Sequence, residues 1–356
     1  MKHLRSIAVA LACTPIFVAS HAPATKIAFT ASEGTTLTKI FTSRLELELD
    51  EMRVLRDGQE PDGLPELEMK VTTDLDVVVK DEYLALADGA PRKLRRSFET
   101  IDVSTLMAME VNLQGQTNNQ DSTVQAGSKL QGETIEFTWN EETKEYGLAF
   151  VENEGDKELL EGLFEDMDLR AFLPGREVEV GEEWEVEPRE ISTVMAPGGD
   201  LKLVPEELAY DMSAMSGQMG ELSDWFDENL QGKVSCRLDE IRSEGEDRIA
   251  VIAIKLELEN DVDLTEMAQE ELERIELPPG AGEIEVAHML IDLRIEGEGV
   301  LLWNLGAGHF HALDVENDFE MKMDIGVSLE LPGFGDVMHS QEFDMSGSLT
   351  FGAEIQ

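Results

Sequence analysis

The feature that most constrains the fold is a strict alternation of apolar and polar residues over long runs. The longest run follows Gly306-Ala307-Gly308, and acidic residues occupy most of the positions between its apolar ones. Its apolar residues are Leu313, Val315, Phe319, Met321, Met323, Ile325, Val327, Leu329 and Leu331. Because successive side chains of a β-strand point to opposite faces, this run predicts one strand about 60 Å long, with an apolar face and an acidic face.

Several other segments repeat this alternation, which indicates that most of the chain forms such strands. Residues 67–79 alternate over a comparable length. Shorter alternating runs lie at 45–49, 252–258 and 289–295, and residues 135–139 and 146–150 flank a turn as a hairpin would. Consecutive strands joined by turns are most simply antiparallel, and strands this long must twist. We therefore expect a large curved, mostly antiparallel β-sheet with long strands.

Three segments have the periodicity of helices. The first ends at Pro174-Gly175 and carries Leu159, Leu160, Leu163, Phe164, Met167 and Phe172. The second begins near Pro205 and carries one stripe formed by Leu208, Met212, Met215, Met219, Leu222 and Phe226. The third follows Asp263 and ends near Ile275. These few helices would pack on the concave apolar face of the sheet, so the expected fold class is α+β.

Two segments lack a clear period. Residues 112–132 are rich in Gln, Asn, Ser and Gly, and we expect a mobile loop there. Residues 187–204 are irregular, with Pro188, Pro197 and Gly198-Gly199, and a sub-division of the chain near them stays open. Otherwise we expect residues 25–356 to form a single large β-rich domain.

A helix-to-strand switch lies near the middle of the chain. After Leu173-Pro174, Val178, Val180, Trp184 and Val186 share one phase, and Gly181 interrupts it as a bulge or a close backbone approach would. Trp184 is therefore expected to fill a core.

This motif resembles one found in a group of uncharacterised exported bacterial proteins, in which a proline is followed by V-x-V-G-x-x-W after a helix. The resemblance covers about the middle third of the chain and implies no activity and no site residues. At the level of the fold alone, a long curved sheet with helices in its hollow is similar to the half-barrel of periplasmic lipoprotein carriers, although this chain is longer than a typical carrier.

The N-terminus predicts export. Lys2 and Arg5 precede an apolar run from residue 7 to residue 18, and Ala22-Pro23-Ala24 provides a cleavage pattern, so residues 1–24 read as a signal peptide. We expect a periplasmic or extracellular protein without a transmembrane segment, since no later run reaches about 18 apolar residues. An alternative is a lipid anchor at Cys13, but apolar residues follow that cysteine where a polar tether is usual.

The charge of the chain restricts the classes of partner that it can bind. The formal net charge is -48, from 28 Lys and Arg against 76 Asp and Glu. Such a surface repels nucleic acid and anionic membranes, and salt or non-specific divalent cations would screen it. The one dense basic cluster is Arg92, Lys93, Arg95 and Arg96. Its residues can either contact an anionic head group or pair with neighbouring carboxylates.

No catalytic signature is present, so we expect no catalytic residues and no enzyme. His309 and His311 would point to one side of a strand, at the mouth of the apolar face, but the sequence identifies no third metal ligand. We therefore predict no metal and no cofactor. Cys236 lies in a strand pattern and is expected to be a packed thiol.

The leading hypothesis is a non-enzymatic exported protein that holds a lipid or another hydrophobic molecule in a groove between sheet and helices. The groove would be lined by Met212, Met215, Met219, Phe226, Met321 and Met323. The alternative is a structural or interaction protein of the cell envelope with a packed core and a cation-screened acidic surface. A third hypothesis, a hydrolase built around His309 and His311, requires a buried carboxylate or a metal beside them.

Overall fold

The computed structural model describes residues 23–61, 63–113, 116–152, 154–205, 230–274, 283–331 and 335–356. The structure is 70% strand and 7% helix. The predicted helix with the stripe from Leu208 to Phe226, and the predicted signal up to residue 22, lie outside the described residues.

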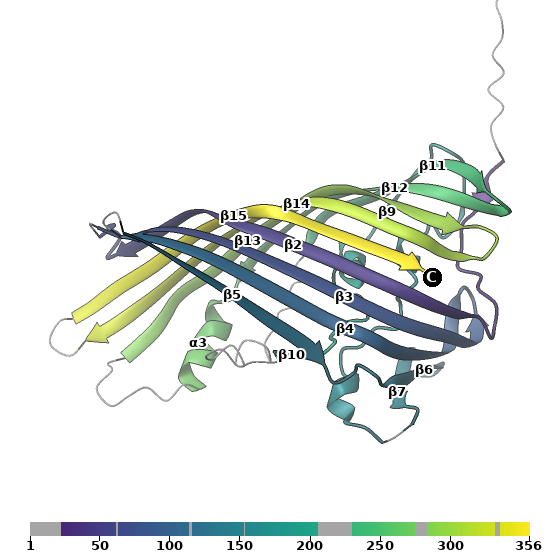
Figure 1. The fold of residues 1–356 in the computed structure, drawn as a ribbon, viewed down its shortest axis with the longest axis horizontal. Helices are drawn as coiled ribbons and strands as arrows, with labels where there is room; N and C mark the ends of the chain where they lie inside the picture. The colour runs from purple at the N-terminus through teal and green to yellow at the C-terminus, as the bar shows by residue number, and fades with distance from the viewer. Residues whose placement is uncertain are drawn as a thin grey trace, which may run out of the picture.

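One large open sheet dominates the molecule (Figure 1). Its strands follow each other in the order β10 (Leu203–Pro205), β5 (Gln116–Ser128), β4 (Ala90–Leu113), β3 (Glu66–Ala87), β2 (Thr36–Arg56), β15 (Gly335–Ile355), β14 (His309–Leu331), β13 (Glu283–Asn304), β12 (Asp247–Asp263), β11 (Gln231–Glu244) and β9 (Glu183–Val186). The hairpin of β6 (Thr134–Asn140) and β7 (Glu145–Phe150) joins this sheet through β4, and β1 (Thr25–Lys26) pairs separately with β8 (Glu177–Val178). The prediction of long antiparallel strands is confirmed, because β14 alone has 23 residues and its neighbours run antiparallel to it.

The order of the strands places the first and last long strands side by side. Strands β2 to β5 form one meander, β11 to β15 form a second, and the pairing of β2 with β15 joins the two. Leu45 lies opposite Leu349, for example, although the two residues are about 300 positions apart in the chain. The period of two keeps the apolar residues of both meanders on one face, here called the inner face.

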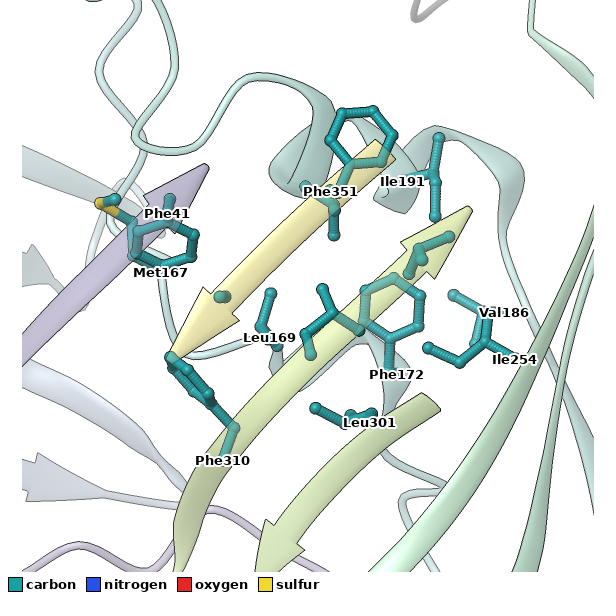
Figure 2. Close-up of a cluster of buried hydrophobic side chains, with 14 of the residues drawn as sticks. Phe41, Met167, Leu169, Phe172, Val186, Ile191, Ile254, Leu301, Phe310 and Phe351 are labelled. Carbon is teal, nitrogen blue, oxygen red and sulfur yellow. The ribbon is translucent and has the colours of Figure 1, made fainter. Parts of the chain in front are cut away.

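The middle segment, residues 156–205, packs against the inner face at one end of the sheet. We call that end the near half, and the end that carries the β2–β3 and β14–β15 connections the far half. In the near half, Phe172 and Leu169 from the middle segment meet Phe41, Leu301 and Phe310 from the sheet, and all five are buried (Figure 2). Most of the hydrophobic core therefore lies in the near half, and Leu293 and Ile295 of β13 extend it toward the far half.

The predicted helix over residues 159–172 is wrong. The segment contains only two short 3-10 turns, η1 (Lys157–Leu160) and η2 (Arg170–Phe172). Between them, Gly162 has φ +76° and Leu169 has φ +58°, which a continuous right-handed helix does not allow. The backbone N–H of Phe164 instead donates to the carbonyl of Gly198. Leu159, Leu160, Leu163, Met167 and Phe172 pack in or against the core, so the helical spacing reflects contact with the core and not a helical backbone.

The predicted loop over residues 112–132 is also wrong in its larger part. Residues 116–128 form β5, which pairs with β4 from Asp102 to Leu113. Its residues from Gln116 to Thr123 are all exposed, so neither face of this strand needs apolar residues. A strand without an apolar face has no period of two, and the sequence pattern could not reveal it.

The third predicted helix is present in the structure, and the irregular stretch contains two short helical elements. The helix predicted after Asp263 is α3 (Thr265–Arg274), and the Asp263 carboxylate accepts a hydrogen bond from the Thr265 N–H at 3.0 Å, as an N-cap does. Figure 1 shows α3 beneath the far half of the sheet. It contacts β13. The irregular stretch contains η3 (Pro188–Ile191) and α1 (Ser192–Met195). In the described residues only α3, a single short helix, lies over the far half, so several packed helices are not confirmed.

The predicted phase of the central motif holds only in part. Trp184 is buried, and its indole N–H donates to the carbonyl of Phe172 at 3.0 Å, as expected of a core residue. Val180, however, is 46% exposed. Gly181 has φ +89° and forms a turn between β8 and β9, which belong to different sheets, so the phase is not shared across it.

A bulge changes the predicted position of the two histidines. The register shifts between Leu302/Trp303 and their partners on β14, so that Phe310 faces the core and is fully buried. His309 and His311 consequently lie out of phase with Leu313, and they are not at the mouth of the apolar face as predicted.

Candidate ligand-binding face

Eight of the 16 methionines in the chain gather on the inner face of the far half. We call this surface the methionine face. It comprises Met52 on β2, Met69 on β3, Met107 and Met109 on β4, Met289 on β13, Met321 and Met323 on β14, and Met345 on β15. These six strands are consecutive neighbours in the sheet, so the face is about 24 Å wide at a strand spacing of about 4.8 Å.

The register brings these methionines together. Met69 lies opposite Met109, and Met321 lies opposite Met345. One position further along the strands, Phe343 stands between Met52 and Met323. Most of the other inner-facing positions hold aliphatic residues, among them Leu49, Leu67, Val71, Val111, Ile291, Leu293 and Ile295, and Phe319, Gly347 and the polar Gln341 occupy three more. The result is a continuous apolar surface assembled from both meanders.

The methionine face is more accessible than the inner face of the near half. Of its eight methionines, Met345 is buried and the other seven are partly exposed. In the near half, by contrast, Val77, Ile101 and Leu313 face the same side and are buried. Methionine is flexible and polarizable, and surfaces rich in it adapt to apolar partners of different shape. This is the kind of surface that can bind a hydrophobic molecule.

The inner-facing positions of the methionine face are free of charge. A row here means the residues that lie opposite one another on neighbouring strands. From the row that contains Val71 to the row that contains Val54, the described residues that point inward are apolar or uncharged. The acidic and basic residues of the same strands alternate with them and point to the outer face, where Lys70 pairs with Glu48 at 2.8 Å. Arg56 and His339 follow in the next inner-facing row, the last one that β2 reaches.

Two of the predicted groove residues, Met321 and Met323, lie on this face. Met212, Met215, Met219 and Phe226 lie outside the described residues. The sequence analysis missed the other six methionines, although Met69, for example, is in phase with its strand's apolar residues. Their phase was visible, but the pairing that joins them was not.

The basic cluster lies at the other end of β4 from Met107 and Met109, and its charges are matched by carboxylates. Arg92 contacts Asp88 at 2.8 Å and Glu141 at 3.1 Å. Lys93 and Arg95 both contact Glu136, at 2.7 Å and 3.0 Å. Burial raises the pKa of Glu136, but its hydrogen bonds to the two cations outweigh burial and hold that pKa below its usual value. Pairing is therefore the structural role of these three cations.

Arg96, the fourth member, belongs to a group of charges in the interior, here called the buried ion cluster. Its guanidinium forms two hydrogen bonds of 2.8 Å with the carboxylate of Asp81. Lys39 contacts Asp81 at 2.7 Å and Asp168 at 2.6 Å, and Tyr83 donates its hydroxyl to Asp168 at 2.5 Å. The side chains of Lys39, Asp81, Arg96 and Asp168 are fully buried. The cluster links β2, β3 and β4 to the middle segment.

The middle segment contributes the remaining members of this cluster. Arg96 donates to the carbonyls of Phe164 and Glu165 at 2.8 and 2.9 Å, while Arg170 contacts the carboxylates of Glu165 and Asp166. One oxygen of Glu165 and one of Asp168 have no hydrogen-bond partner. Burial raises the pKa of Glu165 to about 7, although Arg170 lowers it and the neighbouring Asp166 and Asp168 raise it further.

Charged residues at apolar positions of the alternating strands are the sequence signal for this cluster. Lys39 lies in phase with Leu37 and Phe41, and Asp81 lies in phase with Val79 and Tyr83. A charged residue at an apolar position of an alternating strand must find a partner when it is buried. The cluster is enclosed by core residues, so it fastens the middle segment to the sheet and does not form an accessible reaction centre.

The described residues hold no other arrangement that indicates chemistry. They contain no group of three or more His, Cys, Asp or Glu side chains placed to bind a metal ion. Burial raises the pKa of the Cys236 thiol to about 12, which makes that thiol a poor nucleophile. Among the same residues, no helix is both long enough and apolar enough to cross a membrane.

Comparison with known proteins adds no family. No protein-family model matches the chain, and no curated protein matches its sequence.

Proposed function

We propose that this chain is an exported, non-enzymatic protein that binds a hydrophobic molecule such as a lipid on the methionine face. The observation that carries the proposal is the gathering of eight methionines on six adjacent strands, seven of them partly exposed. A soluble domain normally packs such a surface against another element, as this chain does in its near half. An apolar surface of this size that stays accessible is typical of a binding site.

Variants on the face test the proposal with the fluorescent hydrophobic dye Nile red. The triple substitution Met69→Gln, Met321→Gln and Met323→Gln keeps side-chain size and makes three members of the face polar. We expect the dye to bind the variant at least about tenfold more weakly, which corresponds to a loss of about 1.4 kcal/mol. The measurement is a fluorescence titration of the full chain.

Met338→Gln is the matched control, because Met338 is exposed on the outer face of β15. It should leave the affinity for the dye unchanged. Equal loss in both variants, or no binding by the unaltered protein, would contradict the proposal. Native mass spectrometry of protein purified from its own envelope, followed by organic extraction, would then identify any molecule that co-purifies.

The packed near half favours a second candidate, a structural or interaction protein of the cell envelope. There Trp303, Phe98 and Leu130 are fully buried in the hydrophobic core. On the outer face, a hollow of about 610 Å³ is lined by Glu257, Glu296 and Glu316 and by Lys255, which pairs with Glu257. This candidate requires the acidic surface to bind cations.

A further inference from the structure

We infer that the molecule bound by the methionine face is a long-chain lipid whose head group carries no negative charge. This inference rests on the proposed function and narrows its ligand class. It excludes fatty acids and anionic phospholipids, which are among the commonest amphiphiles of a cell envelope. Four observations about charge lead to it.

The floor of the face offers an anionic head group no partner. The inner-facing residues of the described strands are apolar or uncharged from the row of Val71 to the row of Val54. A carboxylate or phosphate placed among them would lose its water without gaining an ion pair, which costs several kcal/mol. An alkyl chain or an uncharged ester loses little there.

The cations nearest to the face are directed away from it. Arg44 pairs with Asp74 at 2.9 Å, Arg53 with Glu342 at 2.6 Å, and Lys70 with Glu48 at 2.8 Å, all at outward-facing positions. The basic cluster lies at the opposite end of β4 and is matched by carboxylates. These cations are therefore not available to the methionine face.

Among the residues that the structure describes, Arg56 is the only cation at an inner-facing position near the methionine face, and it lies at the rim. It stands two inner-facing rows beyond Met52, or about 13 Å along β2, and it is exposed. An ion pair in so exposed a position contributes only about 0–1 kcal/mol. Across the face, Glu266, Glu270 and Glu273 of α3 are also exposed, so acidic side chains outnumber Arg56 at the part of the rim that the structure describes.

The field of the whole molecule acts in the same direction. A formal net charge of -48 repels any anion that approaches, whichever face it approaches. This repulsion is screened by salt, whereas the cost of burying a charge on the apolar floor is not. Selection against anionic lipids should therefore weaken in high salt without disappearing.

Three compounds with the same hydrocarbon chain provide the test, namely laurate, methyl laurate and lauryl alcohol. Each compound is titrated against the complex of Nile red with the full chain, at a pH where laurate is ionised, and displacement of the dye is measured. We expect the two uncharged compounds to displace the dye at concentrations at least about tenfold lower than laurate does. In about 1 M salt, where the Debye length is about 3 Å, the difference should shrink.

The outcomes separate this inference from the proposed function. Displacement by laurate at concentrations equal to or below those of methyl laurate would overturn the inference and leave the methionine face as a binding site. If Arg56→Gln then removed the binding of laurate, the anionic head group would be placed at Arg56. If Nile red binds but none of the three compounds displaces it, the lipid class is wrong. If the dye does not bind at all, the proposed function itself fails.

Discussion

Lys39 and Asp81 occupy strand positions that the alternation reserves for apolar residues, and their burial explains how the middle segment is held. Removing charges from water is costly, so a buried ion cluster gives orientation more than net stability. Here every carboxylate of the cluster has a cation or a hydroxyl within reach, and Arg96 also donates to two backbone carbonyls of the middle segment. The cluster accepts only one position of that segment, which an apolar contact would not specify.

Leu169 shows the same constraint in the backbone. It has φ +58°, a conformation that costs a leucine about 1 kcal/mol or more, and it is almost fully buried. Its neighbour Asp168 contacts Lys39 and Tyr83, while Arg170 on its other side contacts Glu165 and Asp166. The ion pairs on both sides of Leu169 hold it in this conformation.

Glu165 should make stability depend on pH near neutrality. Its pKa is about 7 in the folded protein and about 4.5 when unfolded, so the folded state binds the proton more tightly. The resulting stabilisation, on the order of 3 kcal/mol, is fully present below about pH 4.5 and is lost as the pH rises through about 7. We expect the urea midpoint of the wild type to fall over this range relative to that of Glu165→Gln, whose amide is always neutral.

Glu161→Gln is the control, because Glu161 is exposed four residues earlier. Glu161→Gln removes an exposed carboxylate close to Glu165 in the sequence, so a pH dependence of the urea midpoint that only Glu165→Gln abolishes belongs to the buried carboxyl group. A difference between the two variants that does not change from pH 5 to pH 8 would show that Glu165 has an ordinary pKa.

At the scale of elements, the sheet depends on close contact between β15 and β2 where the two meanders meet. Gly347 lies opposite Leu47, and a Cβ added to Gly347 would stand 1.7 Å from the carbonyl oxygen of Glu46. Gly347→Ala should therefore push the two strands apart and lower the free energy of unfolding by about 1–3 kcal/mol.

Gly127→Ala on β5 is the matched control for that substitution. Gly127 is also a strand glycine, but a Cβ there meets no atom within 4 Å, so its urea midpoint should stay close to that of the wild type. Equal midpoints for the two variants would mean that β2 and β15 tolerate a wider separation and do not hold the two meanders together as tightly as the structure indicates.

Some of the strands and helices could be predicted from sequence patterns and others could not. The long strands could be predicted because each carries its own period of two, and α3 could be predicted from Asp263 and the pattern after it. Residues 159–172 could not, because a segment wrapped over a core can repeat apolar residues at helical spacing without a helical backbone. Strand β5 could not, because its exposed, polar residues have no phase.

The methionine face could not be predicted in full, because sequence patterns do not show which strands pair. Met321 and Met323 were predicted from their own strand, but Met69 and Met109 reach them only through the pairing of β2 with β15. That contact joins residues about 300 positions apart, and no local pattern encodes it. The same limit applies to the buried ion cluster, whose members come from three strands and the middle segment.

At the scale of the whole molecule, the acidic outer face works against the fold. Across β13 and β14, Glu296 lies opposite Asp318 and Glu298 lies opposite Glu316, pairs of like charge that destabilise a sheet. With a formal net charge of -48, such repulsion extends over the molecule. Raising NaCl from about 0.01 M to about 1 M shortens the Debye length from about 30 Å to about 3 Å, and the thermal midpoint should rise by several degrees.

Divalent cations distinguish screening from binding in this surface. If salt acts only by screening, CaCl₂ or MgCl₂ should raise the thermal midpoint no further than NaCl of the same ionic strength. That outcome is compatible with the lipid-binding proposal. An ion that binds the folded state stabilises it in proportion to the logarithm of its concentration, so an additional rise with divalent cations would indicate that they bind to the acidic surface. That result would favour the cation-bound envelope protein. A midpoint that does not change with salt would contradict the repulsion itself, and the like-charged pairs on the outer face would then have to be neutralised by protonation.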